Sequence, residues 1–184
     1  MMKLLITGFE PFGGAETNPS WDAVEQLPEV CGEYELTKVR VPVVFGTAGD
    51  VVSSSFSEVS PSVALMVGMA AGRDSITPEY VAINLRHTDV PDNSGVTYSS
   101  ESVVPGGADA YFTGLPVFEL AEKLNAQGIP ARVSFSAGTY VCNDLFYTMC
   151  YKYGDKAKIG FVHVPPEMPL ETISEALRII IESI

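Results

Sequence analysis

The sequence predicts an α/β fold: a single three-layer α/β/α domain over residues 1–184, with a largely parallel, twisted mixed sheet flanked by helices. Short apolar runs alternate with segments of helical periodicity, which is the pattern of consecutive strand–helix units. Residues 63–67 are apolar at every position, as expected for a strand buried on both faces of a sheet. No internal repeat or linker interrupts the alternation, and 184 residues are enough for one substantial core.

The first half of the chain is expected to supply strands over residues 3–7, 34–41, 63–67 and 81–85 and helices over residues 19–27 and 47–59. Pro19 suits the first turn of a helix, where its missing N–H leaves no hydrogen bond unmade, and Pro28 ends the same helix. Three consecutive serines at residues 53–55 weaken the second helix, because their side chains compete for backbone hydrogen bonds.

The second half is expected to supply helices over residues 115–127, 141–153 and 171–184 and strands over residues 131–136 and 159–163. The first of these helices has an apolar stripe at Val117, Leu120, Ala121 and Leu124, and Gly128 stops it. Residues 91–114 are the least regular segment. This segment could equally well be a lid or binding loop over a site, or a mobile loop at the surface.

Composition excludes several classes of protein. The net charge is −12, from 11 basic and 23 acidic residues without any Lys/Arg cluster, so a nucleic acid is not an expected partner. No apolar run approaches the ~20 residues that cross a bilayer, and the first strand is too short for a secretory signal. Three cysteines, an odd number without metal-type spacing, predict no metal site and a cytoplasmic location.

One cysteine and one histidine stand where strands are expected to end. Cys142 falls in the first turn of a helix, where unpaired N–H groups and the helix dipole favour the thiolate. His163 ends the next apolar strand. Ligands of α/β sheets bind at the carboxyl ends of the strands, so a nucleophile and its base are one hypothesis for this pair. A buried structural cysteine and a core histidine are the alternatives.

A third group would orient the histidine, and Glu79 is the candidate. It precedes a strand and follows the loop after the buried strand over residues 63–67, although a solvated glutamate is the simpler interpretation. Asp144 is the rival, but the helix twist should turn it away from Cys142. The other histidine, His87, is expected at the surface or at a rim, and Cys150 is expected to be a buried, inert thiol.

The glycine-rich loop over residues 7–14 contains two phenylalanines, Phe9 and Phe12. It lacks the Lys-Ser/Thr pair of a phosphate-binding P-loop, and its glycine spacing is not that of a dinucleotide-binding fold. Two aromatic rings suit a small, flat, apolar ligand better than a phosphate.

Several motifs in a fixed order resemble one known family over almost the whole chain. They occupy residues 5–14, 18–20, 72–73, 76–79, 81–84, 91–93, 115–117, 128–131, 136–143 and 160–165. The most specific are Ser-Ala-Gly-Thr-Tyr-Val-Cys-Asn over residues 136–143 and Gly-Phe-Val-His-Val-Pro over residues 160–165. On these motifs the sequence resembles the pyrrolidone-carboxylate peptidases, also called pyroglutamyl peptidases of type I, a family of cysteine peptidases.

The resemblance implies removal of the N-terminal pyroglutamyl residue from peptides through a thioester, without metal or cofactor. It implies Cys142 as nucleophile, His163 as base and Glu79 as third member. The implied substrate-binding residues are Phe9, Phe12, Asn18, Met69 and Val141, with Arg73 as additional support for the oxyanion. It also implies pyroglutamylated peptides as partners and a homo-oligomer, such as a tetramer.

The chain departs from the family pattern near these residues, at Met69, Ala71, Tyr80, Asp89 and Asp144. Asp89 in place of an arginine changes the local charge by about two units, which weakens electrostatic support near the thiolate. Three alternatives therefore stay open. They are a diverged paralogue with a shifted substrate, a non-catalytic peptide-binding module, and a nucleoside phosphorylase-like enzyme on a similar fold.

Overall fold

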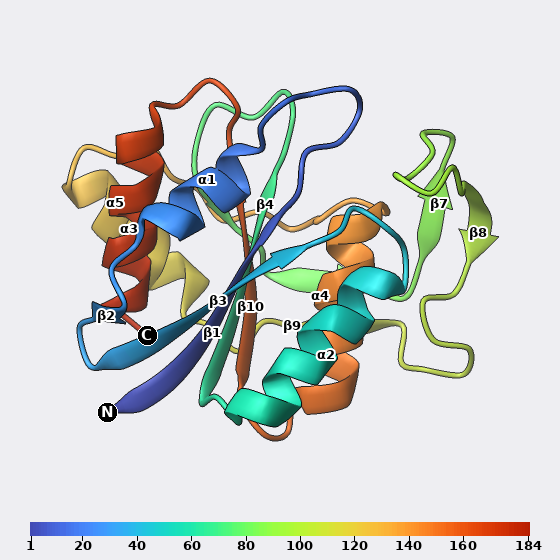
Figure 1. Ribbon diagram of the computed structural model, residues 1–184, viewed down its shortest axis with the longest axis horizontal. Helices are drawn as coiled ribbons and strands as arrows, with labels where there is room; N and C mark the ends of the chain where they lie inside the picture. The colour runs from blue at the N-terminus through green and yellow to red at the C-terminus, as the bar shows by residue number, and fades with distance from the viewer.

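A six-stranded mixed sheet with strand order β2-β3-β1-β4-β10-β5 forms the centre of the computed structural model, which describes residues 1–184 (Figure 1). The strands are β1 (Met2–Phe9), β2 (Val30–Cys31), β3 (Tyr34–Val41), β4 (Val63–Met69), β5 (Thr77–Pro78) and β10 (Lys158–Val164). The four long strands are parallel, and the short edge strands β2 and β5 are antiparallel to their neighbours. The carboxyl ends of β1, β3, β4 and β10 therefore gather at one edge of the sheet.

Helices cover both faces of the sheet (Figure 1). On one face lie α1 (Pro19–Gln26), α3 (Val117–Ala126) and α5 (Leu170–Ile181), and on the other lie α2 (Thr47–Val59) and α4 (Val141–Tyr153). Each face has its own apolar core. Leu4 and Ile6 of β1 pack into the first core and Leu5 packs into the second, as the period of two along a strand requires. The predicted three-layer α/β architecture is confirmed.

The predicted bounds of β3, α2 and α4 coincide with those in the structure. Helix α3 begins at Val117, two residues later than predicted, with Pro116 as its N-cap residue. The proline explains the shift, because it disfavours helical backbone angles in the residue before it. No helix of the structure combines the length with the apolar character that crossing a bilayer requires.

The strand predicted over residues 131–136 is wrong as a regular strand. The segment runs parallel to residues 76–80 but makes only two isolated bridges, Ile76 with Ala131 and Glu79 with Ser134. Backbone bonds flank Pro78 on both sides, from Arg132 N to Ile76 O and from Ser134 N to Pro78 O. Proline has no N–H to donate at the position between them, so the ladder is interrupted there.

The segment over residues 91–114 is more regular than predicted. It contains β8 (Tyr98–Glu101), which pairs with β7 (Arg86–Thr88), and β9 (Ala110–Phe112), which pairs with β6 (Val81–Ile83). The predicted strand over residues 81–85 is therefore shorter and lies outside the central sheet. Figure 1 shows β7 and β8 standing to one side of the molecule, beyond α4. The turn residues of this segment obscured two short antiparallel pairs, of which only the β7–β8 pair is polar.

Candidate active site

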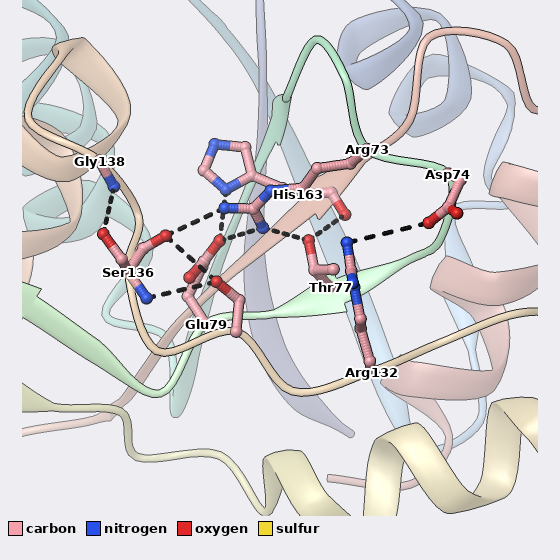
Figure 2. Close-up of polar contacts among 9 residues, drawn as sticks. Arg73, Asp74, Thr77, Glu79, Arg132, Ser136, Gly138 and His163 are labelled. Carbon is pink, nitrogen blue, oxygen red and sulfur yellow. Dashed lines mark hydrogen bonds and ion pairs between the residues drawn. The ribbon is translucent and has the colours of Figure 1, made fainter.

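The structure brings His163 and Glu79 into direct contact (Figure 2). His163 is the last but one residue of β10, and Glu79 directly follows β5. Because β5 pairs antiparallel with β10, and because the N–H of Glu79 donates to the carbonyl of Phe161, the two side chains meet on one face. His163 Nδ1 lies 2.6 Å from Glu79 Oε1, and both side chains are buried.

This contact fixes the proton arrangement of the imidazole. An ionised carboxylate can only accept a hydrogen bond, so His163 donates its Nδ1–H to Glu79 and keeps the Nε2 lone pair free. Burial lowers the pKa of His163 below 6.5, the hydrogen bond to Glu79 opposes this shift, and the positive charge of Arg73 adds to it. A neutral imidazole with a free Nε2 can accept a proton at neutral pH.

The thiol of Cys142 lies in the first turn of α4 and faces a pocket. Gly68 of β4 makes room for the sulfur, since a Cβ atom built on Gly68 would lie 2.9 Å from Cys142 Sγ. Burial, as the largest cause, and the charge of Glu79 together raise the pKa of Cys142 to about 12, against a smaller lowering by Arg73. The helix terminus is expected to favour the thiolate, whereas burial favours the neutral thiol.

Arg73 lies beside Glu79, and Figure 2 shows its guanidinium among the polar groups around that carboxylate. Its Nη1 donates to Glu79 Oε1 at 2.6 Å and also to Thr77, and its Nη2 donates to the carbonyl of Ser136 at 3.0 Å. These bonds direct Arg73 to the carboxylate rather than to the backbone around Cys142. The guanidinium compensates the charge of a carboxylate that has no exposed surface.

A single pocket contains all five residues predicted to bind substrate. Its cavity volume is about 30 Å³, far below the ~300–1,000 Å³ of sites for drug-sized molecules, so the pocket is small and narrow. Its lining residues are Phe9, Phe12, Asn18, Val43, Met69, Tyr140, Val141 and Cys142. None of them carries a charge. The pocket therefore suits a small, neutral ligand with an apolar surface.

Asn18 holds one wall of this pocket in place. It is the N-cap residue of α1, and its Oδ1 accepts hydrogen bonds from the N–H and the hydroxyl of Ser20. Its Nδ2 donates to the carbonyl of Glu10, and the hydroxyl of Ser20 accepts from the N–H of Phe9. These bonds fix the loop after β1, which presents Phe9 and Phe12 to the pocket.

Sequence reasoning missed two residues that line the pocket, Val43 and Tyr140. Both could have been found from their positions: Val43 follows the carboxyl end of β3, and Tyr140 directly precedes α4. The rival carboxylate Asp144 does turn away from Cys142, as predicted, and pairs with Arg86. His87 is exposed and Cys150 is buried, also as predicted.

Comparisons with known proteins agree on one family. The profile of the family described as pyroglutamyl peptidase matches residues 2–184. The pyrrolidone-carboxylate peptidase of Thermococcus onnurineus is 42% identical, over 99% of this chain and 98% of the relative, and that of Enterococcus faecalis is 40% identical, over 99% and 92%. The crystal structure of pyroglutamyl peptidase I from Bacillus amyloliquefaciens superposes with a TM-score of 0.95 at 38% identity, over 100% of this chain and 96% of that one.

The fold and the pocket define an α/β protein with a thiol at a small apolar site and a buried histidine–carboxylate pair. The family match then narrows the class. The chain belongs to the pyroglutamyl peptidase family, which is a family of cysteine peptidases.

We predict that alkylation of Cys142 by iodoacetamide keeps accelerating between pH 7 and pH 10. Only the thiolate reacts, and a pKa raised from 9.0 to about 12 keeps the thiolate a minor species over this whole range. Peptide mapping by mass spectrometry separates Cys142 from the buried Cys31 and Cys150. A rate that levels off below pH 8 would instead mean that the helix terminus outweighs burial.

Proposed function

We propose that this protein is a cysteine exopeptidase that removes the N-terminal pyroglutamyl residue from peptides, with Cys142 as nucleophile, His163 as base and Glu79 as the residue that orients the base. The observation that carries the proposal is the uncharged pocket that contains Cys142. Pyroglutamate has a lactam in place of a free α-amine. An ordinary aminopeptidase needs a carboxylate to bind that amine, whereas a neutral ring needs apolar walls and a few hydrogen bonds.

The reaction begins with proton transfer. His163 Nε2 takes the proton of the Cys142 thiol as the sulfur attacks the carbonyl carbon of the pyroglutamyl residue. The carbonyl oxygen becomes an oxyanion. The N–H groups in the first turn of α4 are available to bind it, because they precede the helical hydrogen-bond ladder and Tyr140 provides no side-chain cap. Glu79 stabilises the imidazolium that forms, through its bond to Nδ1.

The tetrahedral intermediate then collapses to a thioester. The bond between the carbonyl carbon and the peptide nitrogen breaks, and His163 gives its proton to the leaving amine. Water replaces the departed peptide, and His163 removes a proton from it as its oxygen attacks the thioester. The carbon–sulfur bond breaks, Cys142 recovers its proton, and free pyroglutamate leaves. The residues of this chain suffice for every proton transfer in the sequence.

We assign Arg73 a positioning role in place of the oxyanion support that the sequence suggested. Its hydrogen bonds lead to Glu79, Thr77 and Ser136, so it acts on the substrate only through Glu79. Met69, at the end of β4, adds an apolar wall to the pocket. Its thioether is flexible enough to adapt to the carbon atoms of a five-membered ring.

Hydrolysis of a pyroglutamyl fluorogenic amide, compared with the alanyl and prolyl amides, tests the proposed function. We expect release from the pyroglutamyl amide alone. Cys142→Ala should abolish release, because no other group near the pocket can form the thioester. Release that persists without Cys142 would refute the thiol mechanism. Absence of release from every amide would favour the diverged or non-catalytic alternatives.

Gly68→Ala tests whether the space that Gly68 leaves beside Cys142 Sγ is needed to aim the sulfur at the substrate carbonyl. The added methyl would lie 2.9 Å from Cys142 Sγ and displace it, so we expect kcat to fall by about 10²-fold. Gly160→Ala is the matched control. It also overpacks a strand of the sheet, but its methyl meets the side chain of Leu115. It should lower the stability and leave kcat nearly unchanged, and equal losses of kcat in both variants would contradict the idea.

We further propose a homo-oligomer, such as a tetramer, as the working form. Four aromatic side chains, Tyr80, Phe112, Phe118 and Phe135, cluster at the surface with ring centroids 5.2 to 6.3 Å apart. The three phenylalanines are 66%, 54% and 63% exposed. Contiguous exposed apolar surface of this kind favours a protein interface, and oligomers of identical chains reuse one patch on each copy.

Sedimentation velocity tests this assembly. The double variant Phe112→Ser and Phe118→Ser should shift the protein to a smaller species while its unfolding midpoint changes little, because both side chains are mostly exposed. Tyr151→Ser, which removes an aromatic residue that is 49% exposed outside the cluster, is the control. A wild-type protein that sediments as a monomer would exclude the proposal.

We also place the protein in the cytoplasm. Its three cysteines are all free, and two of them are buried where no second thiol could reach them, which fits a reducing compartment. Fractionation of cells that produce the protein, followed by immunoblotting, would contradict this assignment if the protein appeared in the secreted fraction.

A further inference from the structure

An ion pair that takes no part in the proposed reaction lies beside the pocket. Asp144 is two positions after Cys142 in α4, and its side chain has no exposed surface. Its Oδ1 accepts a hydrogen bond from Arg86 Nε at 2.5 Å, and its Oδ2 accepts one from the N–H of Gly46 at 2.9 Å. One carboxylate therefore joins the first turn of α4, the start of α2 and strand β7.

Arg86 extends this contact towards the pocket through aromatic rings. Its guanidinium carbon lies 5.1 Å from the ring centroid of Tyr98 and 5.9 Å from that of Phe45. The ring of Phe45 in turn meets the ring of Tyr140 edge-on, with centroids 5.4 Å apart. Tyr140 lines the pocket and precedes α4. A continuous set of contacts thus runs from the ion pair to the pocket wall.

The pair of strands β7 and β8 is also attached to this region by exposed hydrogen bonds. His87 N donates to the carbonyl of Thr139 at 3.2 Å, Thr139 Oγ1 donates to the carbonyl of His87 at 2.6 Å, and Tyr140 Oη donates to the carbonyl of Pro91 at 3.0 Å. The two side-chain bonds are exposed, so water competes for them. The buried part of the attachment comprises the Arg86–Asp144 pair, the hydrogen bond from Phe45 N to Asp92 Oδ2 at 3.0 Å, and the rings of Tyr98 and Phe45, whose centroids lie 4.8 Å apart.

We propose that Arg86 and Asp144 are positioning residues that set the width of the pyroglutamyl pocket. Asp144 holds the turn that carries Cys142, and Arg86 holds the Phe45–Tyr140 wall against it. The pair acts on the substrate through Tyr140 and contacts no reacting atom. It therefore controls how tightly the ring is bound and leaves the chemical step unchanged. This inference rests on the proposed function for the identity of the ring.

The variants must avoid leaving one buried charge without its partner, because that alone can unfold the protein. The double variant Arg86→Gln and Asp144→Asn removes both charges; Asn keeps the shape of Asp, and Gln gives a shorter, neutral polar side chain at residue 86. Arg86→Lys keeps the charge but replaces the planar guanidinium that lies against Phe45 and Tyr98. Arg178→Gln is the control, since Arg178 makes equally short ion pairs with Glu175 and Glu182 on α5, on the opposite face of the sheet.

In the double variant we expect KM for a pyroglutamyl amide to rise about tenfold while kcat stays within about twofold. Inhibition by 2-pyrrolidone, which is the lactam ring alone, should weaken by the same factor. Arg86→Lys should show part of this effect, and Arg178→Gln should show none. The pH profile of kcat should keep its shape, because His163 and Glu79 are untouched.

A second readout does not need peptidase activity. The ratio of the rates at which bulky N-phenylmaleimide and small iodoacetamide alkylate Cys142 reports the width of the pocket. This ratio should rise several-fold in the double variant. If the wild-type protein hydrolyses no pyroglutamyl amide, the proposed function fails, and this ratio still tests the positioning role.

Two results would overturn the inference. A folded double variant with unchanged KM and an unchanged alkylation ratio would make the ion pair a purely structural contact. A double variant whose kcat falls while KM stays the same would place the pair in the chemical step.

Discussion

Glu79 has no exposed surface, and its Oε1 accepts hydrogen bonds from both Arg73 and His163. A carboxylate removed from water in this way is costly unless charged and polar partners surround it. The antiparallel pairing of β5 with β10 supplies the histidine, and the loop after β4 supplies the arginine. The pairing of β5 with β10 and the loop after β4 thus bring His163 and Arg73 to the same oxygen atom of Glu79.

The same carboxylate has opposite effects on its two neighbours. Its bond to Nδ1 selects the tautomer of His163 whose Nε2 can accept a proton. Its charge disfavours the thiolate of Cys142, and Arg73 offsets part of that effect. In the proposed mechanism, therefore, a neutral thiol depends on the imidazole for its activation more than on the helix terminus.

The periodicity of the sequence predicted the layers and most element bounds, because buried strands and amphipathic helices carry strong patterns. It failed at residues 131–136, where Pro78 in a different segment removes the N–H that a ladder would need. That effect depends on which segments become neighbours, and composition does not reveal it. The strands β8 and β9 were missed for a local reason, since each has only four or three residues and turn residues surround them.

The residues of the candidate site could be predicted from the sequence where they lie in or beside recognisable motifs. Phe9 stands at a strand end within a recognisable motif, and Met69 stands at a strand end where the chain departs from the family pattern; the structure places both in one pocket with Cys142. Val43 carries no motif and is found only from the topology of β3. The contact between Arg86 and Asp144 joins residues 58 positions apart. Neither residue alone signals the other, because a salt bridge of this kind depends on tertiary packing.

The neutral, packed thiol has a consequence for redox chemistry. Peroxides react with thiolates, so a cysteine that holds its proton is oxidised slowly to the sulfenic acid. Gly68 provides just the room that the sulfur occupies, and an added oxygen atom would have to enter the substrate pocket. In the proposed mechanism the sulfur becomes an anion only when the substrate fills that space. The burial that raises the pKa of the thiol would then also slow its oxidation between turnovers.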